Sequence, residues 1–204
     1  MIKITLPDES VKEFENGVTP YEIAKSISEG LARNVLAAKV NGAIVALNYA
    51  ISEDATVKLL TWNDAEGKEV FWHSSAHLMA AAIKKLYPTA KLGIGPAIEN
   101  GFYYDIDFMD NTISSDDFPA IEAKMLEIAQ SKAQYVRKEV SKKEALDYFT
   151  SIGNEYKVEL INDLEDGTIT FYDTADFVDL CRGPHLFDTA SIKAIKLLNT
   201  AGAY

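Results

Sequence analysis

The chain reads Thr19-Pro20-Tyr21-Glu22 between two stretches of alternating hydrophobicity, and this short run decides how the first part folds. The threonine hydroxyl can accept a hydrogen bond from the backbone N–H of the glutamate, whose carboxylate can reach back to the threonine N–H, and proline fits the first turn of a helix. The run therefore predicts the start of a helix. Its apolar stripe is expected to consist of Ile23, Ile27 and Leu31.

Strand patterns lie on both sides of this helix. Upstream, residues 2–14 alternate apolar and polar side chains around a turn, which predicts a hairpin. Downstream, residues 36–47 flank the turn Asn41-Gly42, a strong hairpin signal, and residues 57–60 form one more strand. The order of two strands, a helix and three strands is that of a β-grasp domain. A domain of about 60 residues supports only a small core.

A polar segment at residues 62–69 is the predicted domain boundary, which gives a β-grasp domain at residues 1–62 and a second domain at residues 63–204. The second domain mixes helices with strands, so the fold class is α+β. Its helices are expected over residues 70–87, 118–133, 145–151, with Ser141 opening a capping box, and 156–164. Its strands are expected over residues 102–108 and 168–172.

The composition excludes several classes of protein. Of 204 residues, 48% are hydrophobic, which is enough for packed cores. The chain has 31 acidic and 20 basic residues, and its net charge of −11 excludes a basic nucleic-acid-coating protein. The single cysteine excludes an internal disulfide framework, and no apolar run approaches the roughly 18 residues needed to cross a bilayer. We therefore expect a cytoplasmic protein with no membrane partner.

All three histidines and the one cysteine fall in two matching motifs, His73-Ser-Ser-Ala-His77 and Cys181-Arg-Gly-Pro-His185. Histidines four residues apart on a helix share one face. Three nitrogens and one sulfur have the composition of a tetrahedral zinc site, and equally of a metal-free site for acid–base chemistry near neutral pH. A chance pair of histidines and an inert buried cysteine is the alternative interpretation, and a Cys–His nucleophile is a further one.

Other polar groups lie within apolar segments: Tyr103, Tyr104, Lys157 and Asp179. Packing would explain the two tyrosines, and a solvated helix start would explain the lysine. The glycines of the run Gly93-Ile-Gly-Pro96 lack the spacing of a nucleotide loop and predict a turn. Three basic pairs could meet phosphates, but such pairs are usually solvated faces: Lys84-Lys85, Arg137-Lys138 and Lys142-Lys143.

Three runs in this order behind a β-grasp domain resemble the N-terminal region of bacterial threonyl-tRNA synthetases. They are His73-Ser-Ser-Ala-His77, Gly95-Pro-Ala-Ile-Glu-Asn-Gly-Phe-Tyr-Tyr-Asp105 and Phe177-Val-Asp-Leu-Cys-Arg-Gly-Pro-His185. In that family the first domain is a TGS domain and the second is an editing domain that alanyl-tRNA synthetases share. The third run points to the threonyl branch, although the residues at Phe71-Trp72 and at 172–176 differ from those usual in that branch.

The resemblance implies hydrolysis of seryl-tRNA(Thr). Serine lacks only the methyl group of threonine, and one methyl group discriminates by about 1 to 3 kcal/mol, which is less than translation requires. A second site must therefore remove the error. The class II catalytic domain of the family is absent from this chain, which ends at residues 197–204 as an excised piece would, so we expect no aminoacylation from it.

Matched motif positions imply a role for each site residue. His73 is expected to contact the terminal ribose hydroxyl, Lys157 to position water or stabilise developing charge, and Asp179 to bind the substrate ammonium or hydroxyl group. The residues expected to shape or line the pocket are His77, Tyr104, Cys181 and His185.

We expect no cofactor in this chain, because the ATP, magnesium and zinc of the family belong to the absent catalytic domain. Alanyl-branch relatives hold zinc in the editing site, and the corresponding ligands here would be His73, His77, Cys181 and His185. The expected partner is the acceptor end of tRNA(Thr) carrying serine. The chain is expected to be a monomer, although full-length relatives are homodimers. A free-standing zinc-dependent deacylase and a noncatalytic RNA-binding module remain the alternatives.

Overall fold

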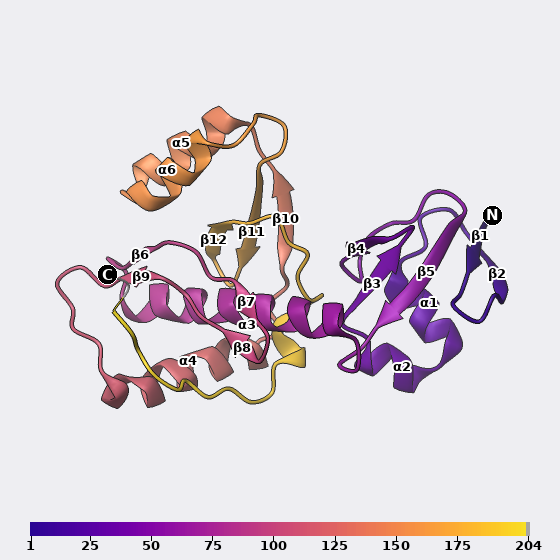
Figure 1. Ribbon diagram of the computed structural model, residues 1–204, viewed down its shortest axis with the longest axis horizontal. Coiled ribbons are helices and arrows are strands. Elements are labelled where there is room, and N and C mark those ends of the chain that lie inside the picture. Colours follow the sequence, from indigo (N-terminus) through magenta and orange to yellow (C-terminus); the bar gives the residue numbers. More distant parts are fainter. Residues whose placement is uncertain (203–204) are drawn as a thin grey trace. The chain divides into compact units, whose positions relative to one another are not determined.

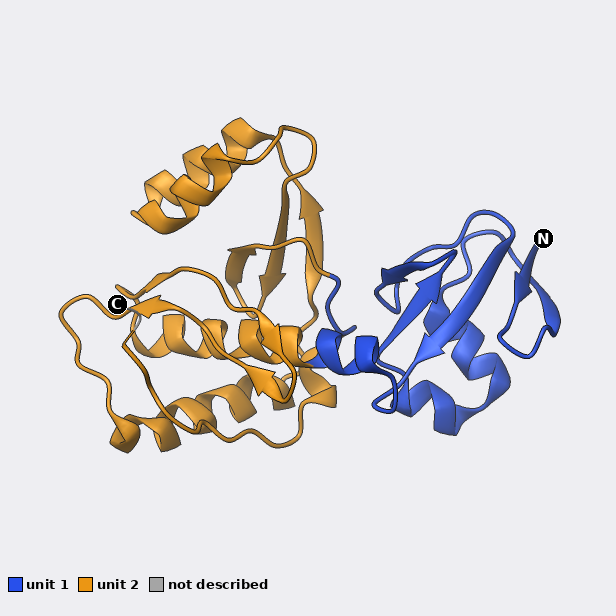
Figure 2. Ribbon diagram, viewed as in Figure 1, with its two compact units in different colours: residues 1–71, 184–187 blue, residues 72–183, 188–204 orange. Residues whose placement is uncertain are grey.

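The computed structural model describes residues 1–202 and divides the chain into two compact units. Unit 1 comprises residues 1–71 and 184–187, and unit 2 comprises residues 72–183 together with the chain from residue 188 (Figure 2). The division falls inside one long helix, whereas the sequence placed a domain boundary after residue 62. The domain limits stay a prediction. Of the terminal segment 197–204, whose ending was expected to be that of an excised piece, residues 203 and 204 lie outside the described part.

Unit 1 contains the predicted β-grasp sheet (Figure 1). Its five strands lie in the order β2-β1-β5-β3-β4, and β1 and β5 run parallel while the other neighbours run antiparallel. The parallel pair brings the first and last strands together at the centre of the sheet. The strands are β1 (Ile2–Thr5), β2 (Val11–Phe14), β3 (Ala37–Val40), β4 (Ala43–Val45) and β5 (Ala55–Leu60).

Two short helices accompany this sheet, α1 (Pro20–Ile27) and α2 (Glu29–Asn34). The capping box of Thr19 and Glu22 is confirmed, with both of its hydrogen bonds formed. The predicted single stripe through Leu31 is wrong, because Ser28 adopts an extended conformation, ends α1 and caps α2 with its side chain. Ile27 is accordingly 42% exposed.

Helix α3 (Ala65–Leu86) begins earlier than the predicted start at residue 70. The glycine at position 67 lets the first turn lie directly against the backbone of Thr61, since a Cβ atom there would overlap the carbonyl oxygen. At the other end the ammonium group of Lys84 donates to the carbonyls of Pro88 and Ala90 at 2.5 and 2.9 Å. This member of the Lys84-Lys85 pair therefore binds the chain that follows the helix.

A three-stranded antiparallel sheet in unit 2 has the order β10-β11-β12. Its strands are β10 (Val136–Glu139), β11 (Thr170–Thr174) and β12 (Phe177–Leu180). The sequence predicted β11 two residues early and did not predict β10, whose four side chains are all exposed. Helices α5 (Lys142–Ser151) and α6 (Glu155–Asn162) pack on one face of the sheet through Phe149, Ile161 and Phe171. Both begin near their predicted starts.

The predicted strand over residues 102–108 is wrong. Two separate two-stranded ribbons replace it, β6 (Lys91–Leu92) with β9 (Ile106–Asp107) and β7 (Ala97–Ile98) with β8 (Gly101–Phe102). The intervening residues leave the strand pattern because the hydroxyl of Tyr104 binds a carboxylate in the interior of unit 2. Residues 93–96, where a turn was predicted, link β6 to β7 without regular structure, and their glycines let Tyr104 lie against them, since a Cβ at Gly95 would overlap the Tyr104 ring.

Helix α4 (Phe118–Gln130) ends three residues before the predicted end at residue 133. Lys132, just after the helix, takes a left-handed conformation with φ 55°. Short 3-10 helices lie at Ser115–Asp117 and Thr189–Ser191. The backbone N–H of Leu197 and the ammonium group of Lys196 both bind Glu122, which ties the chain after the second 3-10 helix to α4. Within the described residues, no helix combines the length and apolar character that a membrane crossing needs.

Candidate functional site

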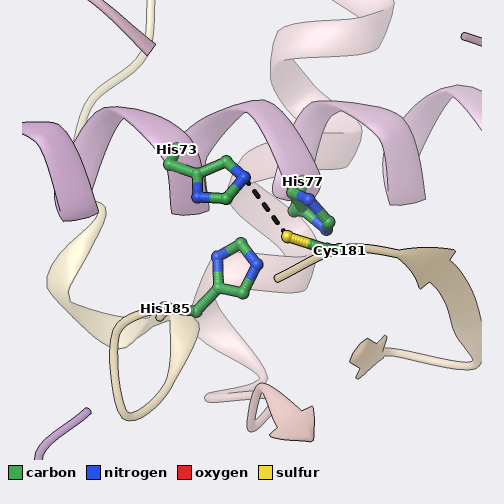
Figure 3. Close-up of side chains that lie close together, drawn as sticks. All are labelled: His73, His77, Cys181 and His185. Atoms are coloured by element: carbon green, nitrogen blue, oxygen red, sulfur yellow. Dashed lines mark hydrogen bonds between the residues drawn. The ribbon is translucent and has the colours of Figure 1, made fainter. Parts of the chain in front are cut away.

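Helix α3 presents His73 and His77 on one face, with their ring centroids 5.1 Å apart and their planes nearly perpendicular. Cys181 directly follows β12, and its Sγ lies 3.3 Å from Nε2 of His73 (Figure 3). His185 follows in the Gly-Pro loop. The ligand atoms of these four residues all lie within 4.8 Å of one another. The structure therefore brings the two sequence motifs together.

Burial sets the charge of these groups. It lowers the pKa of His73, against an opposing effect of the Asp179 carboxylate. It lowers the pKa of His77 much further, and the neighbouring His73 and Lys157 add to the shift. Both imidazoles are therefore neutral near pH 7. Burial raises the pKa of the Cys181 thiol to about 12, which is unfavourable for a thiolate nucleophile.

A buried ion pair lies beside the histidines. The ammonium of Lys157 is 2.7 Å from Oδ1 of Asp179, and the two residues are 2% and 1% exposed. The hydroxyl of Tyr104 donates to Oδ2 of Asp179 at 2.5 Å, and Nε2 of His77 is 3.7 Å from the same oxygen. Burial, followed by the Asp179 charge, raises the pKa of Tyr104 well above its usual value. The solvated-helix interpretation of Lys157 is wrong.

Local structure places each of these side chains. Lys157 lies in the first turn of α6, where its backbone N–H donates to the side chain of Asn154. Asp179 is the third residue of β12 and pairs with Tyr172 on β11. The backbone N–H of Cys181 donates to the carbonyl oxygen of Thr170, and the hydroxyl of Thr170 donates to the carbonyl oxygen of Cys181. These connections fix the lysine and the aspartate from two different elements.

A glycine is required directly after Arg182. Gly183 has a left-handed conformation with φ +68°, and a Cβ atom there would overlap the hydroxyl of Tyr172. Its backbone N–H donates to the sulfur of Cys181 at 3.2 Å. The turn therefore holds the thiol by a main-chain contact.

The donor set fits a zinc ion in composition, with three imidazoles and one thiol close together. Zinc–nitrogen and zinc–sulfur bonds of about 2.0 to 2.3 Å would require the most widely separated ligand atoms to move together. The separation of His73 and Cys181 already suits two ligands of one tetrahedral ion. These four residues could thus hold a metal.

Of the other sequence candidates, Tyr103 is 45% exposed and does not join the buried group. The basic pairs bind nearby carboxylates and carbonyls, as Lys138 does with Glu144 and Lys143 with Asp147. Asn154, which caps α6 and contacts Lys157, is not among the candidates predicted from the sequence. An asparagine directly before a helical pattern is a signal that could have identified it.

Comparison with known proteins gives two family matches. The TGS domain family matches residues 2–61. The second additional domain of threonyl- and alanyl-tRNA synthetases matches residues 169–202, a range that includes Asp179, Cys181 and His185.

Individual relatives match the whole chain. A threonine–tRNA ligase from Cytophaga hutchinsonii is 62% identical over 204 residues, and one from Parabacteroides distasonis is 58% identical over the same length. A threonine–tRNA ligase from Flavobacterium psychrophilum is 54% identical. The chain covers 32%, 31% and 31% of these relatives, so it spans about a third of their length.

Proposed function

Because this chain corresponds over its whole length to the N-terminal region of bacterial threonine–tRNA ligases, with a TGS domain and an editing domain, we propose that it hydrolyses the ester of mischarged seryl-tRNA(Thr). The observation that carries the proposal is the buried pair of Lys157 and Asp179 beside two neutral histidines. Burying two charges costs free energy, and residues with such surroundings gather at catalytic sites.

The reaction adds water to the ester carbonyl and releases serine and the tRNA 3′ hydroxyl. The ammonium of Lys157, 2.7 Å from Oδ1 of Asp179, acts by orienting the water and stabilising the negative charge that develops on the carbonyl oxygen. His73 contacts the terminal ribose hydroxyl, and its neutral ring can transfer a proton at that oxygen. The high pKa of Cys181 favours attack by water over attack by sulfur.

Selectivity for serine follows from the space around the amino acid. Asp179 binds the substrate ammonium or hydroxyl group, and Tyr104 holds this carboxylate in place. Rejection of threonine requires that the rings of His77 and His185 and the Cys181 thiol leave no room for its additional methyl group. The partner is the acceptor end of tRNA(Thr), and the reaction belongs to the cytoplasm, where protein synthesis supplies that substrate.

The test is deacylation of seryl- and threonyl-tRNA(Thr) by this chain at high protein concentration. We expect selective loss of serine, which the substitutions His73→Ala and Lys157→Ala each abolish. The Lys85→Ala variant is the matched control, since this exposed lysine on α3 pairs only with the exposed Asp176 among the contacts that the structure gives. Full rates from both site variants would contradict the proposal.

A zinc-dependent deacylase is the second candidate, because the four ligand atoms lie within 4.8 Å of one another. Zinc bound by His73, His77, Cys181 and His185 would supply a Lewis acid. Under our first proposal, prior treatment with a chelator leaves the rate of serine release unchanged, and metal analysis of the purified chain finds no stoichiometric zinc. Chelator-sensitive hydrolysis that zinc restores would establish the second candidate instead.

A further inference from the structure

Four consecutive residues at the start of α6, residues 154–157, each contact the segment that runs from β6 to β9 or the site beside it. Asn154 donates from Nδ2 to the carbonyl of Leu92 in β6 at 3.1 Å. Glu155 accepts from the ammonium of Lys91 at 2.6 and 2.7 Å. The hydroxyl of Tyr156 donates to Asp107 of β9 at 2.8 Å. We call residues 154–157 the docking turn.

Asn154 is the buried tie between the docking turn and this ribbon. It is 7% exposed, whereas Tyr156 is 40% exposed and the Glu155 side chain is 62% exposed. Exposed contacts of this kind are screened by water and add little. The asparagine side chain binds at both ends, because its Oδ1 also accepts the backbone N–H of Lys157 at 3.3 Å.

The two bonds of Asn154 form a continuous path from β6 to the catalytic lysine. The path runs from the Leu92 carbonyl through the Asn154 amide to the Lys157 backbone, and then along the lysine side chain to Asp179. Asp179 belongs to β12, so the lysine and its carboxylate partner come from separate elements. The distance of 2.7 Å between the Lys157 ammonium and Asp179 therefore depends on the position of α6 relative to β12.

We infer that Asn154 is a positioning residue, which sets the Lys157 ammonium against Asp179 by fixing the docking turn onto β6. The inference rests on the proposed function. A small cavity of about 20 Å³ supports it, because Leu92, Asn154 and Asp179 are among the residues that line it. This volume suffices for one water molecule. Removing the asparagine amide enlarges the space next to the ion pair and lets water compete for the carboxylate.

The substitution Asn154→Ser tests the tie to β6 separately from the helix cap. Serine caps a helix as well as asparagine does, but its side chain is too short to reach the Leu92 carbonyl. We expect kcat for seryl-tRNA(Thr) to fall about 10- to 100-fold with KM unchanged, since a displacement of about 1 Å at a catalytic group costs this much. Tyr156→Phe, which removes an exposed contact of the same turn, is the matched control and keeps the full rate.

A double-mutant comparison separates positioning from simple loss of structure. In a Lys157→Ala background, Asn154→Ser should cause no further fall in rate, because its effect passes through the lysine. A second, independent fall would show a structural role and overturn the inference. An Asn154→Ser variant with an unchanged kcat would overturn it too.

An NMR measurement decides the inference without reference to activity. In the chain labelled with 15N-lysine, the Lys157 ammonium protons are held in a buried ion pair and should exchange slowly enough with water to give a signal, assigned by its loss in Lys157→Ala. We expect Asn154→Ser to remove this signal and Tyr156→Phe to retain it. An unchanged signal in Asn154→Ser refutes the inference, whereas absence of serine release from the unaltered chain refutes only the proposed function.

Discussion

The two units each contain a lysine–aspartate pair at 2.7 Å, Lys58–Asp64 in unit 1 and Lys157–Asp179 in unit 2. The side chains of the first pair are 50% and 19% exposed, and those of the second are 3% and 2% exposed. The charges of an exposed ion pair stay hydrated, so pairing changes the free energy little. The charges of a buried pair lose their hydration almost completely, which costs free energy. Equal distances therefore conceal opposite energetic situations.

The same contrast extends to the two cores. Between residues 1 and 71 no polar or charged side chain is buried, whereas residues 72–183 bury two serines, a histidine, a lysine and an aspartate, among others. Residues 1–71 bury apolar area and keep the side chains of their ion pairs partly or fully exposed. Unit 2 retains costly polar groups in its interior, which is typical of a functional site. The comparison predicts that matched substitutions in the two units will have different consequences.

The largest difference is expected from removing the two lysines. Lys157→Met leaves the Asp179 carboxylate buried without its cation, which costs about 3 to 5 kcal/mol of unfolding free energy. Serine release should fall by at least about 100-fold. Urea unfolding and single-turnover deacylation measure the two effects.

Lys58→Met is the matched control, because it removes a pair with the same separation at the surface. Its urea midpoint and its rate should equal those of the unaltered chain within error. Equal losses of stability in the two variants would show that burial does not distinguish the pairs.

The next largest difference concerns which amides lose protection from hydrogen exchange when a core isoleucine is changed to alanine. Ile4 and Ile161 are both 0% exposed, one in the β1 strand of unit 1 and the other in α6 of unit 2. Each change to alanine should cost about 2 to 5 kcal/mol. Amide hydrogen exchange should increase in residues 1–71 for Ile4→Ala and around α5 and α6 for Ile161→Ala. Uniform loss of protection over both units in either variant would show that the chain unfolds as one body.

A smaller effect on stability, but a clear one on rate, is expected from two glycines. Gly95→Ala places a Cβ atom where the Tyr104 ring lies, so the tyrosine must move away from Asp179, at a cost of about 1 to 3 kcal/mol and with slower serine release. Gly42→Ala in unit 1 meets open space and only the strain of φ +87°, about 1 to 2 kcal/mol. Its rate of serine release should not change. A slower Gly42→Ala variant would contradict this division.

The comparison also explains what the sequence could predict of the fold. In unit 1, period-two alternation located the first hairpin, whose strand β1 buries every second residue, and the Asn41-Gly42 turn located the second. In unit 2, β10 exposes all four side chains and has no alternation to detect. The alternation of apolar and polar residues over 102–108 was misleading. It arises from parts of two short ribbons together with Tyr104, whose hydroxyl binds the buried Asp179.

The site could be predicted in part. Matching four-residue spacings brought His73, His77, Cys181 and His185 into one hypothesis, because a helix turn and a tight loop each place their ends close together. The pairing of Lys157 with Asp179 depends on how α6 and β12 meet, and no local pattern encodes it. Only the family resemblance singled out these two residues as catalytic, and their roles stay predictions. Asn154 has the local signal of a helix cap, but its contact with Leu92, far away in sequence, has none.

The smallest difference is expected at two helix starts that look alike in sequence. Thr19 and Glu22 form a complete capping box in unit 1, with the Glu22 carboxylate accepting the Thr19 N–H at 2.8 Å. Ser141 caps α5 in unit 2, but the predicted reciprocal bond is wrong, since Glu144 pairs with Lys138 instead. Both glutamates lie in a first turn, so their interactions with the helix dipole are similar and cancel in the comparison.

What remains is the two exposed hydrogen bonds that the Glu22 carboxylate accepts from the backbone N–H and the hydroxyl of Thr19, together worth about 1 kcal/mol. Glu22→Ala should therefore lower the unfolding free energy of unit 1 by this amount more than Glu144→Ala lowers that of unit 2. Residue-resolved amide exchange in α1 and α5 measures both values in the same chain. Equal losses would mean that the exposed ion pair of Glu144 replaces the missing half of its capping box, and that the surface of unit 2 compensates for what its helix start lacks.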